Sequence, residues 1–77
     1  MKTVLFCMNP YSFGILYPIM QVLKARNYEY IWFVRAAIVE KFPYRDENLT
    51  THIKDIITFQ SDAIFVPGNE VPYYLRG

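Results

Sequence analysis

Several residue types that build active sites are scarce in this chain. Among its 77 residues there are three glycines, one cysteine and one histidine. A single cysteine excludes an internal disulfide and is typical of a reducing compartment. Neither a zinc ligand set nor a Ser-His-Asp triad can be assembled around the one histidine, His52. The glycines do not form the G-x-G-x-x-G pattern of dinucleotide-binding loops. We therefore predict no metal and no cofactor.

Charged residues are also sparse. The eight basic and seven acidic residues give a net charge of +1, and the basic ones are scattered, so nucleic acid is not expected as a partner. No charged residue lies between Thr3 and Leu23, which raises the question of a membrane helix. Asn9, Pro10 and Pro18 interrupt this segment, whereas a spanning helix needs about 20 consecutive apolar residues. No signal-peptide cleavage pattern follows. The sequence therefore predicts a cytoplasmic protein.

Hydrophobic residues, by contrast, make up 53% of the chain, and 18% of its residues are aromatic. A chain of this length buries only a marginal core by itself. The combination predicts that residues 1–77 are a single partial domain whose missing partner is the carboxyl-terminal half of a larger protein. We expect the isolated chain to self-associate, either through the open strand edge at Ala63–Val66 or through Tyr73, Tyr74 and Leu75.

Three apolar runs rich in β-forming residues predict strands at Thr3–Met8, Tyr30–Val34 and Ala63–Val66. The runs do not alternate between apolar and polar residues, which is typical of strands covered on both faces. A helix between consecutive strands predicts right-handed β-α-β units. The expected fold is therefore α/β, with three α/β/α layers and a parallel, Rossmann-like sheet of at least three strands. The first strand is expected at the centre, flanked by the other two.

Two longer helices are expected between these strands. Leu16, Ile19, Met20 and Leu23 have the spacing of one buried helix face. Pro18 is tolerated in a first turn, so the regular helix is expected to start close to Ser12–Tyr17, with Asn27 as a left-handed stop. The second helix is expected from Thr51, as N-cap, to Gln60. A short helix is predicted over Ala36–Phe42, followed by a polar loop over residues 43–48.

Cys7 ends the first strand and precedes a loop that contains Ser12 and Gly14. This placement is similar to that of the cysteine in the IIB phosphocarrier domains of the sugar phosphotransferase system and in low-molecular-weight tyrosine phosphatases. The loop has no arginine, however, and offers few of the donors that would lower a thiol pKa. We therefore expect Cys7 to be a buried and unreactive core residue.

The acidic residues show no spacing that indicates a pair of catalytic carboxylates. They are expected to be solvated loop or capping residues, namely Asp46, Glu47, Asp55, Asp62 and Glu70.

The loops after the first and third strands are the candidate ligand-binding segments. Both leave the carboxyl ends of neighbouring parallel strands, where ligands of doubly wound sheets bind. An asparagine amide can both donate and accept hydrogen bonds, and glycine permits close approach of the backbone. Ordinary turn chemistry would explain the same residues without any ligand. The candidate ligand-binding residues are Asn9, Tyr11, Ser12, Gly14, Gly68 and Asn69.

The order of these segments resembles that of a known family. The Gly14-x-x-x-Pro18 pattern, the helix end at Leu23–Asn27 and the strand at Tyr30–Val34 are similar to the opening of GT-B glycosyltransferases. Residues 61–72 (SDAIFVPGNEVP) resemble the amino-terminal domain of CDP-glycerol glycerophosphotransferases. UDP-N-acetylglucosamine 2-epimerases share this architecture and are the alternative family. A free-standing IIB-like phosphocarrier or a docking module is the alternative outside these enzymes.

The resemblance implies a two-domain transferase that makes teichoic-acid-like or capsular polymers. Its active site would lie between two Rossmann-like halves, with the donor on the carboxyl-terminal half. A polyol-phosphate or sugar acceptor would lie near the amino-terminal half, and the intact protein would work at the inner face of the membrane. The family's His-Gly motif would follow Gly77. The resemblance therefore implies an acceptor-side portion that is inactive alone and carries no catalytic residue.

Overall fold

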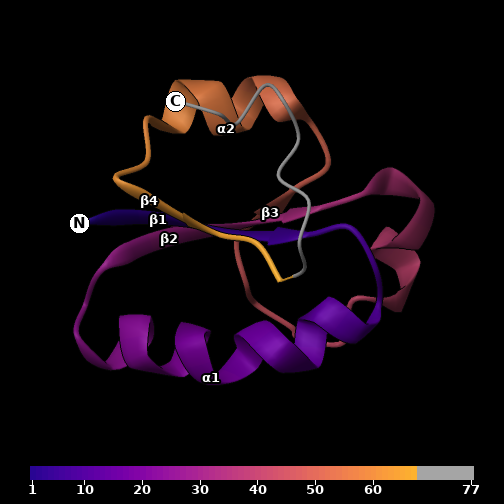
Figure 1. Cartoon of the computed structure of the whole chain (residues 1–77), viewed down its shortest axis with the longest axis horizontal. Helices are drawn as coiled ribbons and strands as arrows, with labels where there is room; N and C mark the ends of the chain where they lie inside the picture. The colour runs from indigo at the N-terminus through magenta and orange to yellow at the C-terminus, as the bar shows by residue number, and fades with distance from the viewer. Residues whose placement is uncertain (68–77) are drawn as a thin grey trace.

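The computed structural model of the chain describes residues 1–67 and has an α/β fold. The elements in chain order are β1 (Lys2–Cys7), α1 (Tyr11–Ala25), β2 (Glu29–Val34), the 3₁₀ helix η1 (Ala36–Lys41), β3 (Leu49–Thr50), α2 (Ile53–Phe59) and β4 (Ala63–Phe65). The four strands form one parallel sheet in the order β3-β2-β1-β4. Figure 1 shows α1 on one face of this sheet and α2 on the other. The predicted three-layer, Rossmann-like architecture is confirmed.

β1 lies between β2 and β4, as the sequence predicted. Cys7 pairs with Val34 on one side, and Leu5 pairs with Phe65 on the other. The fourth strand, β3, was not predicted, because two residues next to a polar loop carry no apolar run. It extends the sheet beyond β2, where Leu49 pairs with Trp32. The chain then returns through α2 to the far side of β1, so its direction of progress reverses at β1.

Alternation along β1 and β2 divides the core into two clusters. The side chains that pack toward α1 are those of Leu5, Cys7, Trp32 and Val34. The residues between them, Val4, Phe6, Ile31 and Phe33, pack toward α2. All eight are buried, as expected for central strands of a parallel sheet that has helices on both faces.

Helix α1 packs on the sheet through the face that the sequence predicted. Leu16, Met20 and Leu23 are buried, and Ile19 is partly buried against the same cluster. The expected position of Pro18 in the first turn is wrong, because the helix already begins at Tyr11 and Pro18 lies inside it. Pro18 is tolerated there because it is on the exposed side of the helix, where water can solvate the carbonyl that lacks its usual N–H donor.

Helix α2 is short, and its amino-terminal end is held by the strand before it. The N-cap residue is His52 rather than Thr51, and no side chain caps the helix directly. Thr50 takes over this role: its Oγ1 accepts the His52 N–H at 3.1 Å and donates to Asp55 Oδ2 at 2.5 Å. The helix ends at Gln60, which has a left-handed conformation with φ of 54°.

The remaining turns agree with the sequence patterns. Asn27 has a φ of 59° after α1, as expected for a left-handed stop. The short helix predicted over Ala36–Phe42 is present as η1. Within residues 1–67, no helix is long and apolar enough to cross a membrane.

Candidate functional site

The carboxyl edge of the sheet is the candidate ligand-binding edge. Because the strands are parallel, β1, β2 and β4 all end there, at Cys7, Val34 and Phe65. The chain lies on one side of β1 before the reversal and on the other side after it. In open α/β sheets, ligands bind outside the carboxyl ends of the strands at such a point, here between β1 and β4.

Arg35, the first residue after β2, is fixed at this edge by two hydrogen bonds. Its backbone N–H donates to Cys7 O at 3.1 Å, and its side-chain Nε donates to Met8 O at 3.1 Å. The side chain thus reaches from the end of β2 to the end of β1. The residue is exposed, and within residues 1–67 no carboxylate forms an ion pair with it. A guanidinium held in this way still has terminal N–H groups for a phosphate or carboxylate ligand.

Sequence reasoning did not identify Arg35 as a site residue. The sequence pattern alone does not show that the Arg35 side chain crosses to the end of β1. The sequence signal for Arg35 is its position, because it is the only basic residue directly after one of the three predicted strands.

The candidate residues after β1 differ in their exposure to solvent. Asn9 is exposed, and Tyr11 is 59% exposed, so both are open to a ligand. Ser12 is 1% exposed and is part of the protein interior. The interpretation of residues 9–14 as a loop is wrong from Tyr11 onward, because α1 begins there and turns Ser12 toward the core. Gly14 is exposed on α1, and a Cβ at this position would meet no atom within 4 Å.

Gly68 and Asn69, the candidates after β4, lie outside the described residues. The last described residue, Pro67, is partly buried.

The start of α1 offers a ligand few free backbone donors. The N–H of Ser12 donates to Asn9 O at 3.0 Å, and that of Phe13 donates to Pro10 O at 3.2 Å. Pro10 itself has no N–H. Helix starts bind phosphate mainly through free first-turn amides, so the start of α1 is a poor phosphate site, and Arg35 is the better candidate donor at this edge.

Cys7 is fully buried between the sheet and α1, as predicted. Burial raises the pKa of its thiol from 9.0 to about 12. At neutral pH the sulfur is therefore protonated and shielded, which makes it a poor nucleophile.

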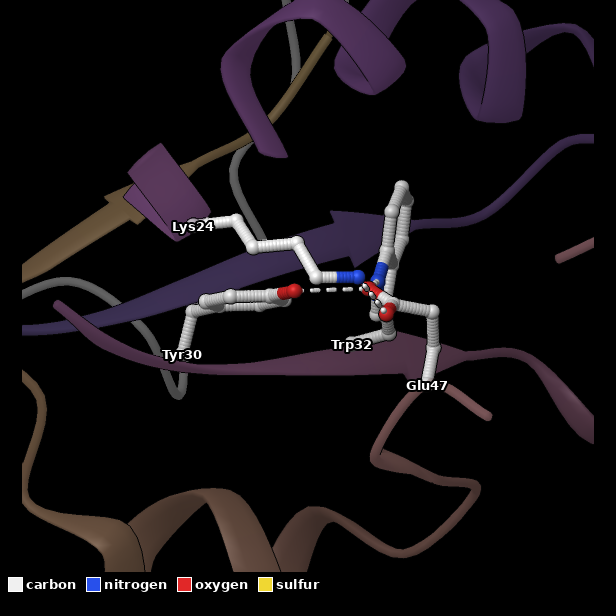
Figure 2. A network of polar contacts seen from close by, with 4 residues as sticks. All are labelled: Lys24, Tyr30, Trp32 and Glu47. Carbon is white, nitrogen blue, oxygen red and sulfur yellow. Dashed lines mark hydrogen bonds and ion pairs between the residues drawn. The ribbon is translucent and has the colours of Figure 1, made fainter. Parts of the chain in front are cut away.

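A second polar cluster, on the α1 side of the sheet, is centred on Glu47 and is drawn in Figure 2. Glu47 Oε1 accepts hydrogen bonds from the Tyr30 hydroxyl at 2.9 Å and from Trp32 Nε1 at 3.1 Å. Its Oε2 lies 3.5 Å from Lys24 Nζ, at the carboxyl-terminal end of α1. The expectation that Glu47 is a solvated loop acid is wrong, because its side chain is only 6% exposed.

The environment of Glu47 also changes the acidity of its neighbour. Burial, followed by the hydrogen bond from its hydroxyl to Glu47 and the negative charge of Glu47, raises the Tyr30 pKa from 10.0 to about 12. Both oxygens of Glu47 have protein partners, so this network fixes the loop before β3 against β2 and α1. The sequence signal for this network is the pair Tyr30 and Trp32, two residues apart in a predicted strand. Both side chains need a hydrogen-bond acceptor when they are buried.

The other titratable residues are dispersed. His52 is exposed at the start of α2. Residues 1–67 contain no group of three or more His, Cys, Asp or Glu side chains placed to hold a metal ion.

Comparisons of the chain with protein-family models, with curated proteins and with solved structures find no match.

Proposed function

We propose that the chain is the acceptor-side, amino-terminal portion of a GT-B-type transferase that resembles CDP-glycerol glycerophosphotransferases. In this proposal the carboxyl edge of the sheet binds a polyol-phosphate acceptor, and the donor nucleotide and the catalytic base belong to the other half of the enzyme. The portion binds its ligand but transfers nothing alone.

The observation that carries this proposal is the position of Arg35. Its guanidinium is anchored to Met8 at the point where the chain reverses, beside the exposed Asn9. An arginine presents paired N–H groups that match phosphate oxygens, and an asparagine amide can bond to a hydroxyl group. A small molecule with one phosphate and neighbouring hydroxyl groups fits this combination of donors and acceptors.

The phosphocarrier alternative is less well supported. A cysteine phosphocarrier must present its sulfur as a thiolate to the donor phosphate. Cys7 is fully buried, and its pKa of about 12 keeps the thiol protonated at neutral pH.

Titration of the ¹⁵N-labelled chain with sn-glycerol 3-phosphate, followed by NMR, tests the proposal. We expect saturable shift changes at Asn9, Tyr11 and Arg35, and no saturable change with glycerol. Losing a hydrogen bond to a charged group removes about 1.5–3 kcal/mol, so Arg35→Gln should raise Kd roughly ten- to a hundredfold.

Arg26→Gln is the matched control. It removes the same charge from an exposed arginine at the carboxyl-terminal end of α1, whereas the proposed site lies near the amino-terminal end of this helix. It should leave Kd unchanged. Equal effects of the two variants, or shift changes confined to another surface, would contradict the proposed site. Transfer from CDP-glycerol by the isolated chain would contradict the proposed division between the two halves.

A further inference from the structure

Two tyrosine side chains from separate segments pack against each other on the α1 side of the sheet. Tyr17 lies in α1, and Tyr44 lies in the segment after η1. Their ring centroids are 4.6 Å apart, and the ring planes are inclined by 31°. Both residues are partly buried, so each still has surface in contact with solvent. The fold therefore holds the pair together and leaves it within reach of a small dissolved reagent.

The position of the Tyr44 side chain is fixed by further contacts. Its hydroxyl donates to Phe13 O on α1 at 3.0 Å. Phe13 and Tyr17 are four residues apart on this helix and so lie on the same face, one turn apart. The Tyr44 ring also packs against Phe42, at 5.4 Å between centroids, and against Trp32, at 5.5 Å. These contacts hold the Tyr44 ring beside Tyr17. Within residues 1–67, no other two tyrosine rings are in contact.

Phenol rings held this close join when both are oxidised. A one-electron oxidant takes one electron from each phenol, whose hydroxyl proton passes to solvent, and a neutral phenoxyl radical remains. Two such radicals form a carbon–carbon bond between their ortho positions. The hydrogen on each of these carbons then moves to the oxygen of the same ring. The product is a dityrosine with both hydroxyls restored; the oxidant has gained two electrons, and the solvent has gained two protons.

We propose that Tyr17 and Tyr44 form an oxidative cross-linking site, at which a dissolved one-electron oxidant converts the pair into an intramolecular dityrosine. Two rings joined in this way have centroids only slightly closer than those of this pair. The bond ties α1 to the segment between η1 and β3 and closes a loop of chain that contains β2. A closed loop restricts the unfolded chain, so oxidation stabilises the fold.

The cysteine does not compete with this pair for the oxidant. Cys7 is fully buried, and burial raises the pKa of its thiol to about 12. Cysteine is oxidised most readily as an accessible thiolate, which this residue does not supply at neutral pH. The inference is independent of the proposed transferase function.

Oxidation of the dilute chain by photochemically generated tris(bipyridyl)ruthenium(III), with persulfate as the final electron acceptor, tests the proposal. Dilution disfavours coupling between chains. We expect a monomer whose mass is lower by two hydrogen atoms and that shows dityrosine fluorescence. Trypsin should then release residues 3–24, which contain Tyr11 and Tyr17, joined to residues 42–45, in which Tyr44 is the one tyrosine.

Replacing one ring of the pair tests the assignment. Tyr17→Phe should abolish the joined peptide, because phenylalanine has no hydroxyl proton to lose and forms no phenoxyl radical. Tyr11→Phe is the matched control, since Tyr11 lies in the same helix and is 59% exposed. It should leave the yield unchanged. Circular dichroism establishes that each variant is folded, and Tyr44→Phe replaces Tyr17→Phe if that variant is not.

Oxidation in urea tests whether the fold selects this pair. The yield of the joined peptide should fall severalfold in the unfolded chain, and the cross-linked chain should unfold at a higher urea concentration than the untreated one. A joined peptide that persists in Tyr17→Phe overturns the proposal, because Tyr11 would then be the partner of Tyr44. Absence of the joined peptide from the folded wild-type chain, or an equal yield in urea, also overturns it.

Discussion

Among residues 1–67, nine buried residues form one cluster on the α1 side of the sheet, and five form another on the α2 side. The same two central strands supply both faces, so the difference comes from the covering layers. Helix α1 has 15 residues and is reinforced by η1 and the loop after it, whereas α2 has seven residues. Ile56 is the only fully buried residue of α2, and its neighbour Ile57 is 65% exposed.

The two faces also differ in the way that aromatic rings pack. On the α1 face, Trp32 meets Phe42 edge to face at 5.2 Å, and Phe13 meets Phe42 in the same way at 5.3 Å. Tyr44 joins this group and donates its hydroxyl to Phe13 O at 3.0 Å. Among residues 1–67, the α2 face has one stacked pair, Phe6 with Phe33, with ring centroids 4.5 Å apart. We infer that the α1 face supplies most of the stability of the described fold, because more of the buried apolar side chains of residues 1–67 pack there.

The largest expected difference between the faces concerns one helix residue on each. Leu16 is 2% exposed on α1, and Ile56 is 3% exposed on α2. Truncation to alanine removes buried methyl groups and leaves a cavity whose cost depends on how far the surroundings relax. We expect Leu16→Ala to lower the free energy of unfolding by about 4 kcal/mol and Ile56→Ala by about 2 kcal/mol.

Urea denaturation followed by circular dichroism measures both values. A domain of this size has only about 5 kcal/mol of total stability, so Leu16→Val and Ile56→Val serve as the milder pair if Leu16→Ala has no folded baseline. An equal loss for both variants, or a larger one for Ile56→Ala, would show that the two faces contribute alike.

The sequence predicted the central strands and the buried face of α1, but it missed the contacts of Glu47 and Arg35. The runs at Thr3–Met8 and Tyr30–Val34 are continuous and apolar, which requires cover on both faces and therefore predicts the layers and the place of β1. The spacing of Leu16, Met20 and Leu23 likewise predicts the buried face of α1. These patterns are local, and each is decided within one segment of the chain.

The missed polar contacts of Glu47 and Arg35 depend on partners that are distant in the sequence. Glu47 is buried because Tyr30 and Trp32, 17 and 15 positions away, donate to it. Similarly, Arg35 is a candidate site residue because its side-chain Nε donates to Met8 O, 27 positions away. No periodicity within a loop records such contacts. The predicted ligand residues therefore include Ser12, which the structure buries, and omit Arg35.

The next prediction concerns the polar network around Glu47 on the α1 face. In Glu47→Ala, the partly buried Tyr30 hydroxyl and the buried Trp32 N–H lose their acceptor, and Lys24 loses its ion pair. We expect a loss of about 2–3 kcal/mol, because an unsatisfied buried donor costs about 1–3 kcal/mol. Glu47→Gln keeps one acceptor oxygen, so about half of that loss is expected. Thermal and urea unfolding measure both.

Asp46→Asn is the matched control for the Glu47 variants. Asp46 is exposed and has a φ of 62°, a conformation that asparagine tolerates, so its replacement should change stability by less than about 0.5 kcal/mol. If Glu47→Ala changed the free energy of unfolding as little as this control, the network would contribute no net stability to the fold. The greater stability of the α1 face would then come from apolar packing alone.

The smallest expected effect is on the α2 face, where one side chain, that of Thr50, makes two hydrogen bonds. Thr50 Oγ1 accepts the His52 N–H and donates to Asp55 Oδ2, so it ties β3 to the first turn of α2. Thr50→Val keeps the side-chain shape and removes both bonds. Loss of a helix-capping interaction typically costs about 1 kcal/mol, and we expect that value here.

Because α2 has so few buried residues, the loss should appear as local opening. Hydrogen exchange should become faster in residues 53–59 and stay unchanged in α1. Faster exchange in both helices would mean that the two faces open together as one cooperative unit. The difference in their packing would then cause no difference in their local stability.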